Sequence, residues 1–600
     1  RTTMEIFTSI IDFLTYWLVE QYWFPIFLIG SGIFFTIYLG FPQIKYFKHG
    51  WRILSGKYVK EDTKGETTPF QALTTALSGT VGTGNIGGVA LAIFLGGPAA
   101  IFWMWITAFF GMTTKFVEVT LAHKYRETLA DGSISGGPMY YIENGLKMKW
   151  LAVLFSICLL LMCLGTGNMP QISSISVLMN DAFNIPGIVT GTVLSILLYF
   201  SIIGGIKRIA KIATKLVPFM AFFYLIGSFA VIVENYDQIL PSLSSIFIHV
   251  FTPSAAVGGF LGASVAAAIQ RGVNRGLYSN EAGQGSSPIA HASSKTENSV
   301  EEGMVSILEP FIDTIVICTI TGLVILSSGV WTEKFENEFE QSSIVYAEGI
   351  FLEDISEDAT SLRNMFYGEN EEIKFTGVLE ISEGKLISTN VTLTHNKSIA
   401  ENVQYFIKPT ADNSIKLIDS SWFERQVVNR IKSVYLYLAY NFNPNNWKKI
   451  EDMNLQNFSG NITVKNGYIE APNNILLKGD SLLLGADLTG KAFTRSVFGE
   501  YGQYIVAIGL LLFAFSTVIA WSYYGDRATV HLFGEGWVLY YRIIYVGAFF
   551  TASIIDTKIV WDIATVIGPV ATVPNLIALL LLRKEMKSTT DQYEMPLDTK

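Results

Sequence analysis

The sequence predicts an all-α polytopic membrane protein that carries a soluble, mainly β insert. Half of the 600 residues are hydrophobic, 16% are charged, and the mean hydropathy is +0.37. Several apolar stretches exceed the roughly 20 residues that a helix needs to cross a bilayer. In the second half of the chain a long polar segment interrupts this pattern. These observations exclude an ordinary soluble enzyme and indicate a protein embedded in the lipid bilayer.

The negative charge is concentrated in the polar segment. The whole chain has a formal net charge of −9, and residues 333–485 contain 22 acidic and 14 basic side chains, which is −8. The remainder is close to neutral, so no nucleic-acid partner is indicated. The three cysteines lie in apolar stretches and predict neither a disulfide framework nor a zinc site.

We expect eleven membrane spans, each an apolar stretch of helical length. The expected spans are 22–41, 69–95, 100–123, 150–178, 188–205, 216–234, 258–283, 304–329, 501–524, 537–553 and 560–582. Before them, residues 4–20 have the periodicity of an amphipathic helix that lies at the membrane surface. The chain begins with Arg1 rather than Met, which is compatible with a trimmed or incomplete N-terminus.

Basic residues predict the orientation of these spans. The connector after the first span and those at 124–149 and 206–215 are basic, whereas 96–99, 180–187 and 235–257 contain no Lys or Arg. Basic connectors stay in the cytoplasm. The N-terminus and the polar segment are therefore predicted outside, and the C-terminus in the cytoplasm.

The polar segment is expected to fold as a separate unit. It contains short stretches of alternating polar and apolar residues, such as 373–381, which are typical of strands with one exposed face. The predicted organisation is a first membrane part, an insert, a second membrane part and a cytoplasmic tail. Their boundaries are 1–331, 332–495, 496–583 and 584–600. The ligand or partner of the insert stays unknown at this point.

The spans form two sets of five once the first is set aside. The second to sixth and the seventh to eleventh spans have opposite predicted orientations, and each set begins with a glycine-interrupted helix. Inverted repeats with discontinuous helices near the membrane midplane are typical of secondary transporters. The predicted fold is therefore a 5+5 inverted repeat.

The interruption of the second span is the first candidate for a solute site. Residues 78–88 read Ser-Gly-Thr-Val-Gly-Thr-Gly-Asn-Ile-Gly-Gly within an apolar stretch. Irregular backbone at membrane depth persists only where it lines a cavity or is buried in protein. The N–H end of a broken helix attracts a carboxylate and the carbonyl end attracts a cation, so an amino acid and a sodium ion would fit together. The alternative is a helix-packing face, because Gly84 and Gly88 have the small-residue spacing.

Polar side chains in other spans are further candidates. Ser516 and Thr517 are adjacent hydroxyls that either bond their own backbone or bind a cation. Gln171 either makes an interhelical hydrogen bond or contacts a substrate. Asp313 is expected to have a structural or coupling role.

Two arginines of the seventh span are costly at membrane depth and are therefore functional candidates. Arg271 and Arg275 lie one helical turn apart. Arg275 has a simpler alternative, which is an ion pair with Glu281 or Asp313.

Four runs of the sequence resemble the alanine/glycine:cation symporter family. They are residues 78–86, 204–210, 275–283 and 521–525. The resemblance covers nearly all of the membrane portion. It implies a leucine-transporter-like fold in a prokaryotic cytoplasmic membrane. It also implies that small neutral amino acids such as alanine, glycine and serine are imported with sodium by alternating access.

The resemblance also implies roles for individual residues. Thr83, Gly84 and Asn85, in a Val-Gly-x-Gly-Asn pattern, would bind the substrate, and Thr83 and Gly84 would hold its carboxylate. Gln171 and Trp521 would shape the pocket, and Gly272 would lie at the break of the seventh span. The implied sodium ligands are the carbonyls of Ser78 and Val81 and the hydroxyls of Ser516 and Thr517.

Three features depart from the pattern of this family. The insert replaces a short connector, and the usual Asn-Gly before the final span is missing near 567–570. Arg271 stands where an aromatic or neutral residue is more usual, so an acidic amino acid that binds Arg271 is the alternative substrate. A sensor that acts through the insert and proton coupling through Asp313 are two further alternatives.

Overall fold

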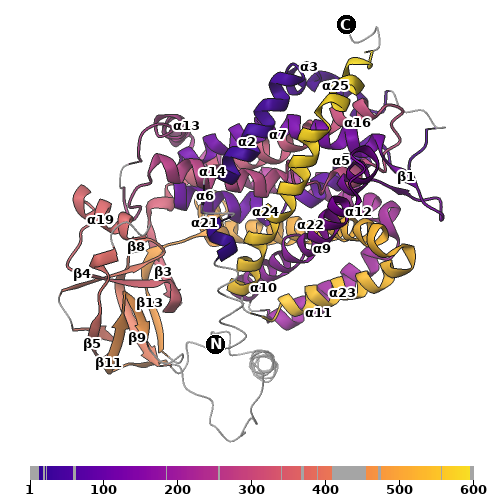
Figure 1. Cartoon of the computed structure of the whole chain (residues 1–600). Coiled ribbons are helices and arrows are strands. Elements are labelled where there is room, and N and C mark those ends of the chain that lie inside the picture. The colour runs from indigo at the N-terminus through magenta and orange to yellow at the C-terminus, as the bar shows by residue number, and fades with distance from the viewer. Residues whose placement is uncertain are drawn as a thin grey trace, which may run out of the picture.

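The structure, a computed structural model, is a helical bundle with a β-rich unit at one end (Figure 1). It describes residues 13–17, 21, 23–57, 63–183, 185–254, 257–339, 341–366, 371–387, 390–407, 455–470, 475–555 and 557–594. The surface helix expected at 4–20 lies largely outside these ranges.

Five helical segments of the described ranges are long and apolar enough to cross a membrane. They are Ala99–Lys124, Lys149–Asn180, Gly205–Glu234, Ser299–Ser328 and Gly499–Phe533. Two bent helix pairs raise the number to seven if each pair is one span. Two further apolar helices, Trp23–Tyr38 and Gly187–Ile202, are shorter. The protein is therefore a polytopic membrane protein, while the eleven spans and their inverted repeat stay predictions.

The helices before the β-rich unit follow the order of the expected spans. The first are α2 (Trp23–Tyr38), α3 (Pro42–Lys45), α4 (Phe47–Leu54), α5 (Pro69–Thr80), η2 (Gly84–Gly88), α6 (Val89–Gly96), α7 (Ala99–Lys124), α8 (Pro138–Tyr140) and η3 (Tyr141–Gly145). Next come α9 (Lys149–Gly165), α10 (Met169–Phe183), α11 (Gly187–Ile202), α12 (Gly205–Glu234), η4 (Tyr236–Gln238) and α13 (Ile239–Ile248). The last are α14 (Val265–Asn280), α15 (Pro288–His291), α16 (Ser299–Ser306), α17 (Leu308–Pro310), η5 (Phe311–Cys318), α18 (Thr319–Ser328) and η6 (Val330–Thr332).

Five helices follow the β-rich unit and complete the bundle. They are α21 (Gly485–Phe493), α22 (Gly502–Phe533), α23 (Val538–Ala552), α24 (Thr557–Leu581) and α25 (Arg583–Asp591). α22 is central, because it packs against α5, α9, α10 and α12. Aromatic side chains such as Trp521 and Tyr524 are fully buried along it.

Local sequence explains where the two helices that frame the site begin. At α5, Thr68 Oγ1 accepts a hydrogen bond from Gln71 N at 3.2 Å, and Gln71 Oε1 accepts one from Thr68 N at 3.0 Å. This reciprocal pair is a capping box, and proline at the first helical position suits it. At α14, Ser264 Oγ caps the helix by accepting from Ala267 N at 3.1 Å.

The described residues of the β-rich unit form three small antiparallel sheets, with strand orders β10-β9-β13-β3, β12-β11-β5-β6 and β4-β7-β8. The strands are β3 (Lys334–Phe339), β4 (Ile344–Glu348), β5 (Gly377–Ser382), β6 (Lys385–Leu386), β7 (Val391–His395), β8 (Ser398–Ile399), β9 (Glu401–Ile407), β10 (Gln456–Asn457), β11 (Gly460–Lys465), β12 (Tyr468–Glu470) and β13 (Ile475–Leu482). The α-helix α19 (Ser356–Phe366) accompanies them in the described part of this unit, and a separate hairpin joins β1 (Glu127–Thr128) and β2 (Ile134–Ser135). The β character predicted for the insert is confirmed.

The predicted end of the insert at residue 495 lies beyond its last strand. β13 ends at Leu482, and α21 then packs against α22 and η2. Leu488 and Ala492 are buried in the main core of the bundle. Their spacing of four residues puts both on one face of a helix, which is why α21 joins the helices rather than the sheets.

Candidate functional site

The helix is broken where the second span was predicted to be irregular. α5 ends, Val81 takes an extended backbone conformation with φ −76° and ψ 95°, and the chain resumes as η2 and α6. The two halves are bent by 57°. Glycine permits the close approach of α22 here, because a Cβ on Gly82 would lie 2.7 Å from Thr517 Oγ1. The prediction of a break is confirmed, and backbone carbonyls at the end of α5 are left without helical partners.

Asn85 holds this break in place. Its Oδ1 accepts a hydrogen bond from Gly82 N at 2.9 Å, and its Nδ2 donates to Asp313 Oδ1 at 2.7 Å and to Ser279 Oγ at 3.1 Å. Asp313 accepts further bonds from Ser279 and Thr314. The Asn85 side chain, a predicted substrate contact, is fully buried and links η2 to α14 and η5.

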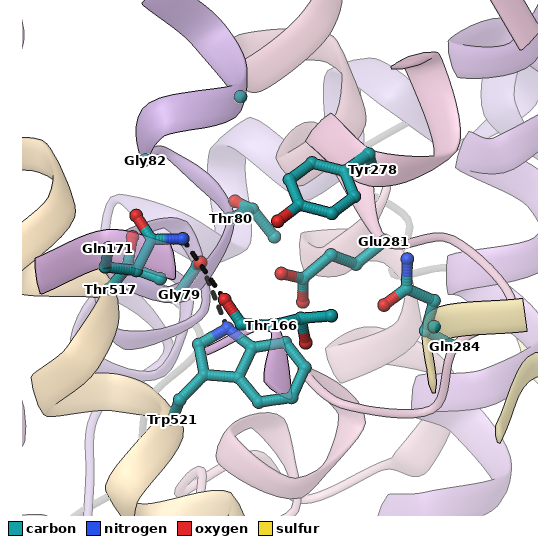
Figure 2. A pocket seen from close by; sticks show the side chains of 12 residues that line it. Gly79, Thr80, Gly82, Thr166, Gln171, Tyr278, Glu281, Gln284, Thr517 and Trp521 are labelled. Carbon is teal, nitrogen blue, oxygen red and sulfur yellow. Dashed lines mark hydrogen bonds between the residues drawn. The ribbon is translucent and has the colours of Figure 1, made fainter. Parts of the chain in front are cut away.

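A narrow cleft lies beside the break, and the space of about 370 Å³ between its lining atoms includes open solvent. Trp521 Nε1 donates to Gly79 O at 3.3 Å, and Gln171 Nε2 donates to Thr166 O at 3.2 Å, so the indole and the amide form fixed walls (Figure 2). The lining residues are Gly79, Thr80, Gly82, Gly84, Thr166, Gln171, Tyr278, Glu281, Gln284, Thr517, Trp521 and Gly568. Three of the residues implied to bind substrate, Gly84, Gln171 and Trp521, are therefore brought together.

Thr83 lies in the chain between two lining residues, Gly82 and Gly84, and is not itself in the described lining. Its backbone N–H donates to Gln171 Oε1 at 3.4 Å. Its hydroxyl is buried and has no hydrogen-bond partner among the described residues. A buried polar group without a partner costs roughly 1–3 kcal/mol, so a bound ligand that pairs with this hydroxyl would gain affinity.

Glu281 is the charged side chain among the described residues that line the cleft. Figure 2 shows its carboxylate pointing into the space between Thr80 and Thr166. Its Oε2 accepts a hydrogen bond from Ser286 Oγ at 2.6 Å. Glu281 follows the last residue of α14 and has a φ of 55°, a left-handed conformation that costs a non-glycine residue on the order of 1–3 kcal/mol.

Sequence reasoning missed Glu281 because it put the break of the seventh span too early. α14 is continuous through Gly272, where a Cβ would lie 2.4 Å from Ala100 O and 2.6 Å from Trp103 Cβ. Gly272 therefore allows close packing of α14 on α7, and the prediction of a break there is wrong. The helix ends before Glu281, and the signal for this break is the pair Gly283 and Gly285, with φ of 92° and 79°.

The four implied cation ligands converge where α22 passes the break. Ser516 Oγ lies 3.4 Å from Ser78 O, and Thr517 Oγ1 lies 3.3 Å from Val81 O. Both hydroxyls also reach Phe513 O of their own helix, at 2.8 and 3.1 Å. Each hydroxyl can donate its one hydrogen either to a carbonyl at the break or to Phe513 O. In both cases it keeps its lone pairs, so its oxygen atom can still bind a hard cation.

The two arginines of α14 do not belong to the described lining of the cleft. The guanidinium carbon of Arg275 lies 5.7 Å from the centre of the Tyr278 ring. Among the ion pairs between described residues, none joins Arg275 to Glu281 or Asp313. The expectation of such a pair is wrong, because both carboxylates accept hydrogen bonds from neutral neighbours instead.

A network of buried charges lies behind Glu281. Lys115 Nζ pairs with Glu309 Oε1 at 3.0 Å and also contacts Ser287. His291 Nδ1 lies 2.6 Å from Glu302 Oε1. Burial alone would lower the pKa of His291, but the hydrogen bonds and charges of Glu302 and Glu309 raise it to about 9. This network holds α15 and α16 against α7.

Comparison with known proteins identifies the family. The sequence model described as "Sodium:alanine symporter family" matches residues 4–355 and 473–600. The chain belongs to this family. It is a symporter rather than an enzyme, and the family supports cation-coupled amino-acid transport as its activity.

Two relatives of the symporter extend over most of its length. An uncharacterized transporter of Haemophilus influenzae is 32% identical over 569 residues, which cover 95% of the symporter and 92% of the relative. The sodium/alanine symporter AgcS of Methanococcus maripaludis is 32% identical over 570 residues, which cover 94% and 93%. The probable sodium/glutamine symporter GlnT of Bacillus subtilis is 40% identical over 304 residues, which cover 51% and 62%.

The family match leaves out residues 356–472 of the symporter. This segment contains α19 and the strands from β5 to β12. Most of the β-rich unit is therefore additional to the sequence pattern of the family.

Proposed function

We propose that the symporter imports alanine, glycine and serine together with sodium by alternating access. One observation carries this proposal. The cleft combines a carboxylate, Glu281, with the broken backbone at Gly82 to Gly84, and the oxygen cluster of Ser516 and Thr517 adjoins the same break. A zwitterion and a cation would use all three groups at once.

The substrate would bind through both of its charges. The N–H group of Gly84 and the unpaired Thr83 hydroxyl would receive the carboxylate, and the Thr83 N–H would join them by exchanging its present bond to Gln171 Oε1. Glu281 would receive the ammonium group by a charge-assisted hydrogen bond. The fixed side chains of Trp521 and Gln171 limit the remaining space, which favours a small substrate side chain.

Sodium would bind to Ser78 O, Val81 O, Ser516 Oγ and Thr517 Oγ1. Val81 precedes the residues that would hold the substrate carboxylate, so one backbone turn serves both ligands. Sodium that orders this turn would lower the conformational cost of substrate binding. The two affinities would then rise together, as linkage requires.

The membrane arrangement proposed with this function has eleven spans in a 5+5 inverted repeat with a leucine-transporter-like fold. The breaks after α5 and after α14 would lie in the first helix of each repeat. The N-terminus and the insert would lie outside a prokaryotic cytoplasmic membrane and the C-terminus inside, with domain boundaries near 331 and 583 and an insert that ends after β13 rather than at 495, because α21 packs in the bundle.

An acidic substrate that binds Arg271 is a weaker proposal. Arg271 is not among the described residues of the cleft, and Glu281 would repel a second carboxylate. Glutamine is the second candidate, because one relative is named a probable sodium/glutamine symporter.

Uptake into proteoliposomes tests the proposal. Radiolabelled alanine would be supplied with and without an inward sodium gradient and would compete with unlabelled glycine, serine, glutamine or glutamate. We expect sodium-driven uptake that glycine and serine inhibit and glutamate does not. Inhibition by glutamine alone would support the second candidate. Uptake that does not depend on sodium would contradict the assigned cation.

A further inference from the structure

An open groove runs along the exposed face of α12 at the N-terminal end of this helix. It begins in the run 204–210, to which the proposed function assigns no role, and it has room for about 830 Å³. The described residues that line it include no acidic side chain. The lining contains four basic side chains, which are those of Lys207, Arg208, Lys211 and Lys215.

These four cations are exposed and have no partner among the described residues. A basic side chain nearby differs in this respect, because the guanidinium of Arg542, beside Gly205, pairs with Asp526 at 2.6 Å. Three of the four cations follow one another at a spacing of four residues, and like charges at this spacing on a helix repel one another. An anion bound among them would relieve that repulsion.

The length of α12 puts the cations at a membrane surface. The helix has 30 residues, so it is about 45 Å long, whereas the hydrocarbon core of a bilayer is only about 30 Å thick. Residues 216–233 contain no charged side chain. The part of α12 that suits the hydrocarbon core therefore begins just after Lys215, and the basic turns lie at the level of the lipid headgroups.

The cations also lie on the side of α12 that faces lipid. Phe222 comes seven residues after Lys215, and Ile226 and Phe229 follow at spacings of four and three, which keeps all four on one side of the helix. The exposed fractions of the three apolar side chains are 66%, 49% and 66%. On its other side α12 packs against α5 and α22. A lipid beside this face meets cations at its headgroup and apolar side chains along its acyl chains.

We propose that this groove binds an anionic phospholipid of the leaflet at the basic end of α12. Lys211 and Lys215 receive its phosphate, and Leu216 and Phe219, which also line the groove, contact its glycerol and the first part of its acyl chains. A soluble phosphate ester would leave this apolar wall in water, whereas acyl chains cover it. The sequence predicts this end of α12 in the cytoplasm, where the leaflet carries anionic lipids.

Basic residues at a helix end have a simpler explanation, which is that they only fix the orientation of the span. Orientation requires basic residues in the connector but no particular face of the helix. In α12 the cations share one face and continue into an exposed apolar stripe. The two explanations differ in one measurable result, which is whether anionic lipid is enriched at this face over other lipid-facing parts of the protein.

Quenching of a fluorescent label by brominated lipids tests the proposal in the full-length protein. Phe222→Cys puts a bimane label on the stripe without changing the described lining of the groove, and the three natural cysteines are buried. The protein is reconstituted in phosphatidylcholine vesicles with increasing fractions of phosphatidylglycerol or phosphatidylcholine that is brominated on its acyl chains. Each lysine near the surface gives about a fivefold preference for anionic lipid, so half-maximal quenching should need a roughly 30-fold lower fraction of phosphatidylglycerol.

Matched variants locate the preference. Lys211→Gln with Lys215→Gln should raise the fraction of phosphatidylglycerol for half-maximal quenching at least about tenfold. Lys385→Gln with Lys465→Gln is the control, because it changes the net charge equally at two exposed lysines of the insert, outside the described lining. Quenching by brominated phosphatidylcholine should be the same in both variants.

A second label position measures the general attraction of anionic lipid to the protein. Ile157 is 45% exposed on α9 and lies eight residues after Lys149, so Ile157→Cys puts the label at a depth similar to that of Phe222→Cys. Lys149 pairs with Glu143 at 3.7 Å, so it is not free to attract a lipid phosphate. We expect no more than a weak preference for phosphatidylglycerol at this position.

A preference at Phe222→Cys that is absent at Ile157→Cys and lost with the two lysines of the groove would support the lipid site. Equal quenching by the two brominated lipids at Phe222→Cys would overturn it, as would the same preference at both label positions or an equal loss in both lysine variants. A preference that excess glycerol phosphate abolishes would assign the groove to a soluble phosphate ester and refute the lipid. The measurement involves no transport, so its result is independent of the proposed function.

Discussion

Thr517 Oγ1 lies 3.3 Å from the carbonyl oxygen of Val81, a residue 436 positions earlier in the chain. The contact joins the long helix α22 to the break between α5 and α6. The residue after Val81 lines the cleft, so the oxygen cluster and the cleft share one short piece of backbone. We therefore expect a substitution in the oxygen cluster to affect the cleft, and a substitution in the cleft to affect the oxygen cluster.

The double substitution Ser516→Ala and Thr517→Ala should weaken sodium binding. Each hydroxyl lost from an ion is worth about 1.5–3 kcal/mol, so the sodium concentration for half-maximal uptake should rise at least about tenfold. The measurement is alanine uptake as a function of sodium at constant ionic strength. Ser522→Ala is the control on the same helix, because Ser522 Oγ donates to Ile519 O at 2.7 Å. An unchanged sodium dependence in the double variant would show that the cation binds elsewhere.

Glu281→Gln should remove the charge that receives the substrate ammonium. Glutamine has nearly the same shape and can still accept the hydrogen bond of Ser286, so the fold should persist. The loss of a charge-assisted hydrogen bond costs about 1.5–3 kcal/mol, which predicts about 10- to 100-fold weaker alanine binding. Equilibrium binding of radiolabelled alanine at saturating sodium measures this effect. Glu500→Gln is the exposed control, and equal affinities of both variants would refute the role of Glu281.

The break near Gly82 could be predicted from the sequence, whereas the break after α14 could not be located. A glycine in an apolar span permits either irregular backbone or close helix packing. Gly82 lies in irregular backbone and also lets α22 pack closely, whereas Gly272 does only the second, because α7 passes directly against it. The role of each glycine depends on a neighbouring helix, so local sequence alone did not favour Gly283 and Gly285 over Gly272 as the position of the break.

The orientation of the Asn85 side chain could not be predicted from the sequence either. η2 is a π-helical turn, which shifts side chains around the axis relative to a regular α-helix. The shift turns the Asn85 amide toward Asp313 and leaves Gly84 at the cleft. The residue types of the site could thus be predicted from their chemistry. The rotation of the chain at η2 determines which of them line the cleft, as Gly84 does, and which are buried in hydrogen bonds beside it, as Asn85 is.

Gly167→Ala should disturb the aromatic wall of the cleft. A Cβ at this position would lie 2.3 Å from Trp521 Cγ and Cδ2, which are parts of a rigid ring, so the indole must move. The hydrogen bond from Trp521 Nε1 to Gly79 O would be lost with it. We expect lower uptake and a shift of preference from alanine toward glycine, read from competition between the two. Gly547→Ala on α23 is the control, since no atom lies within 4 Å of its Cβ, and an equal effect of both variants would contradict this explanation.

The insert should lose stability as the pH falls. Burial lowers the pKa of His395 to about 4, and its ring stacks on Phe339 at 4.1 Å. Above the ordinary histidine pKa of about 6.5 the ring is neutral in both the folded and the unfolded state, so the full stability is present. Between about 6.5 and 4 the unfolded state binds the proton first, and up to about 3 kcal/mol of stability is lost.

Hydrogen exchange of peptides from β7 and β13 at pH 7.5, 5 and 4 measures this loss. His395→Leu should flatten the pH dependence of exchange, because leucine does not titrate. An identical drop in the variant would assign the effect to other groups.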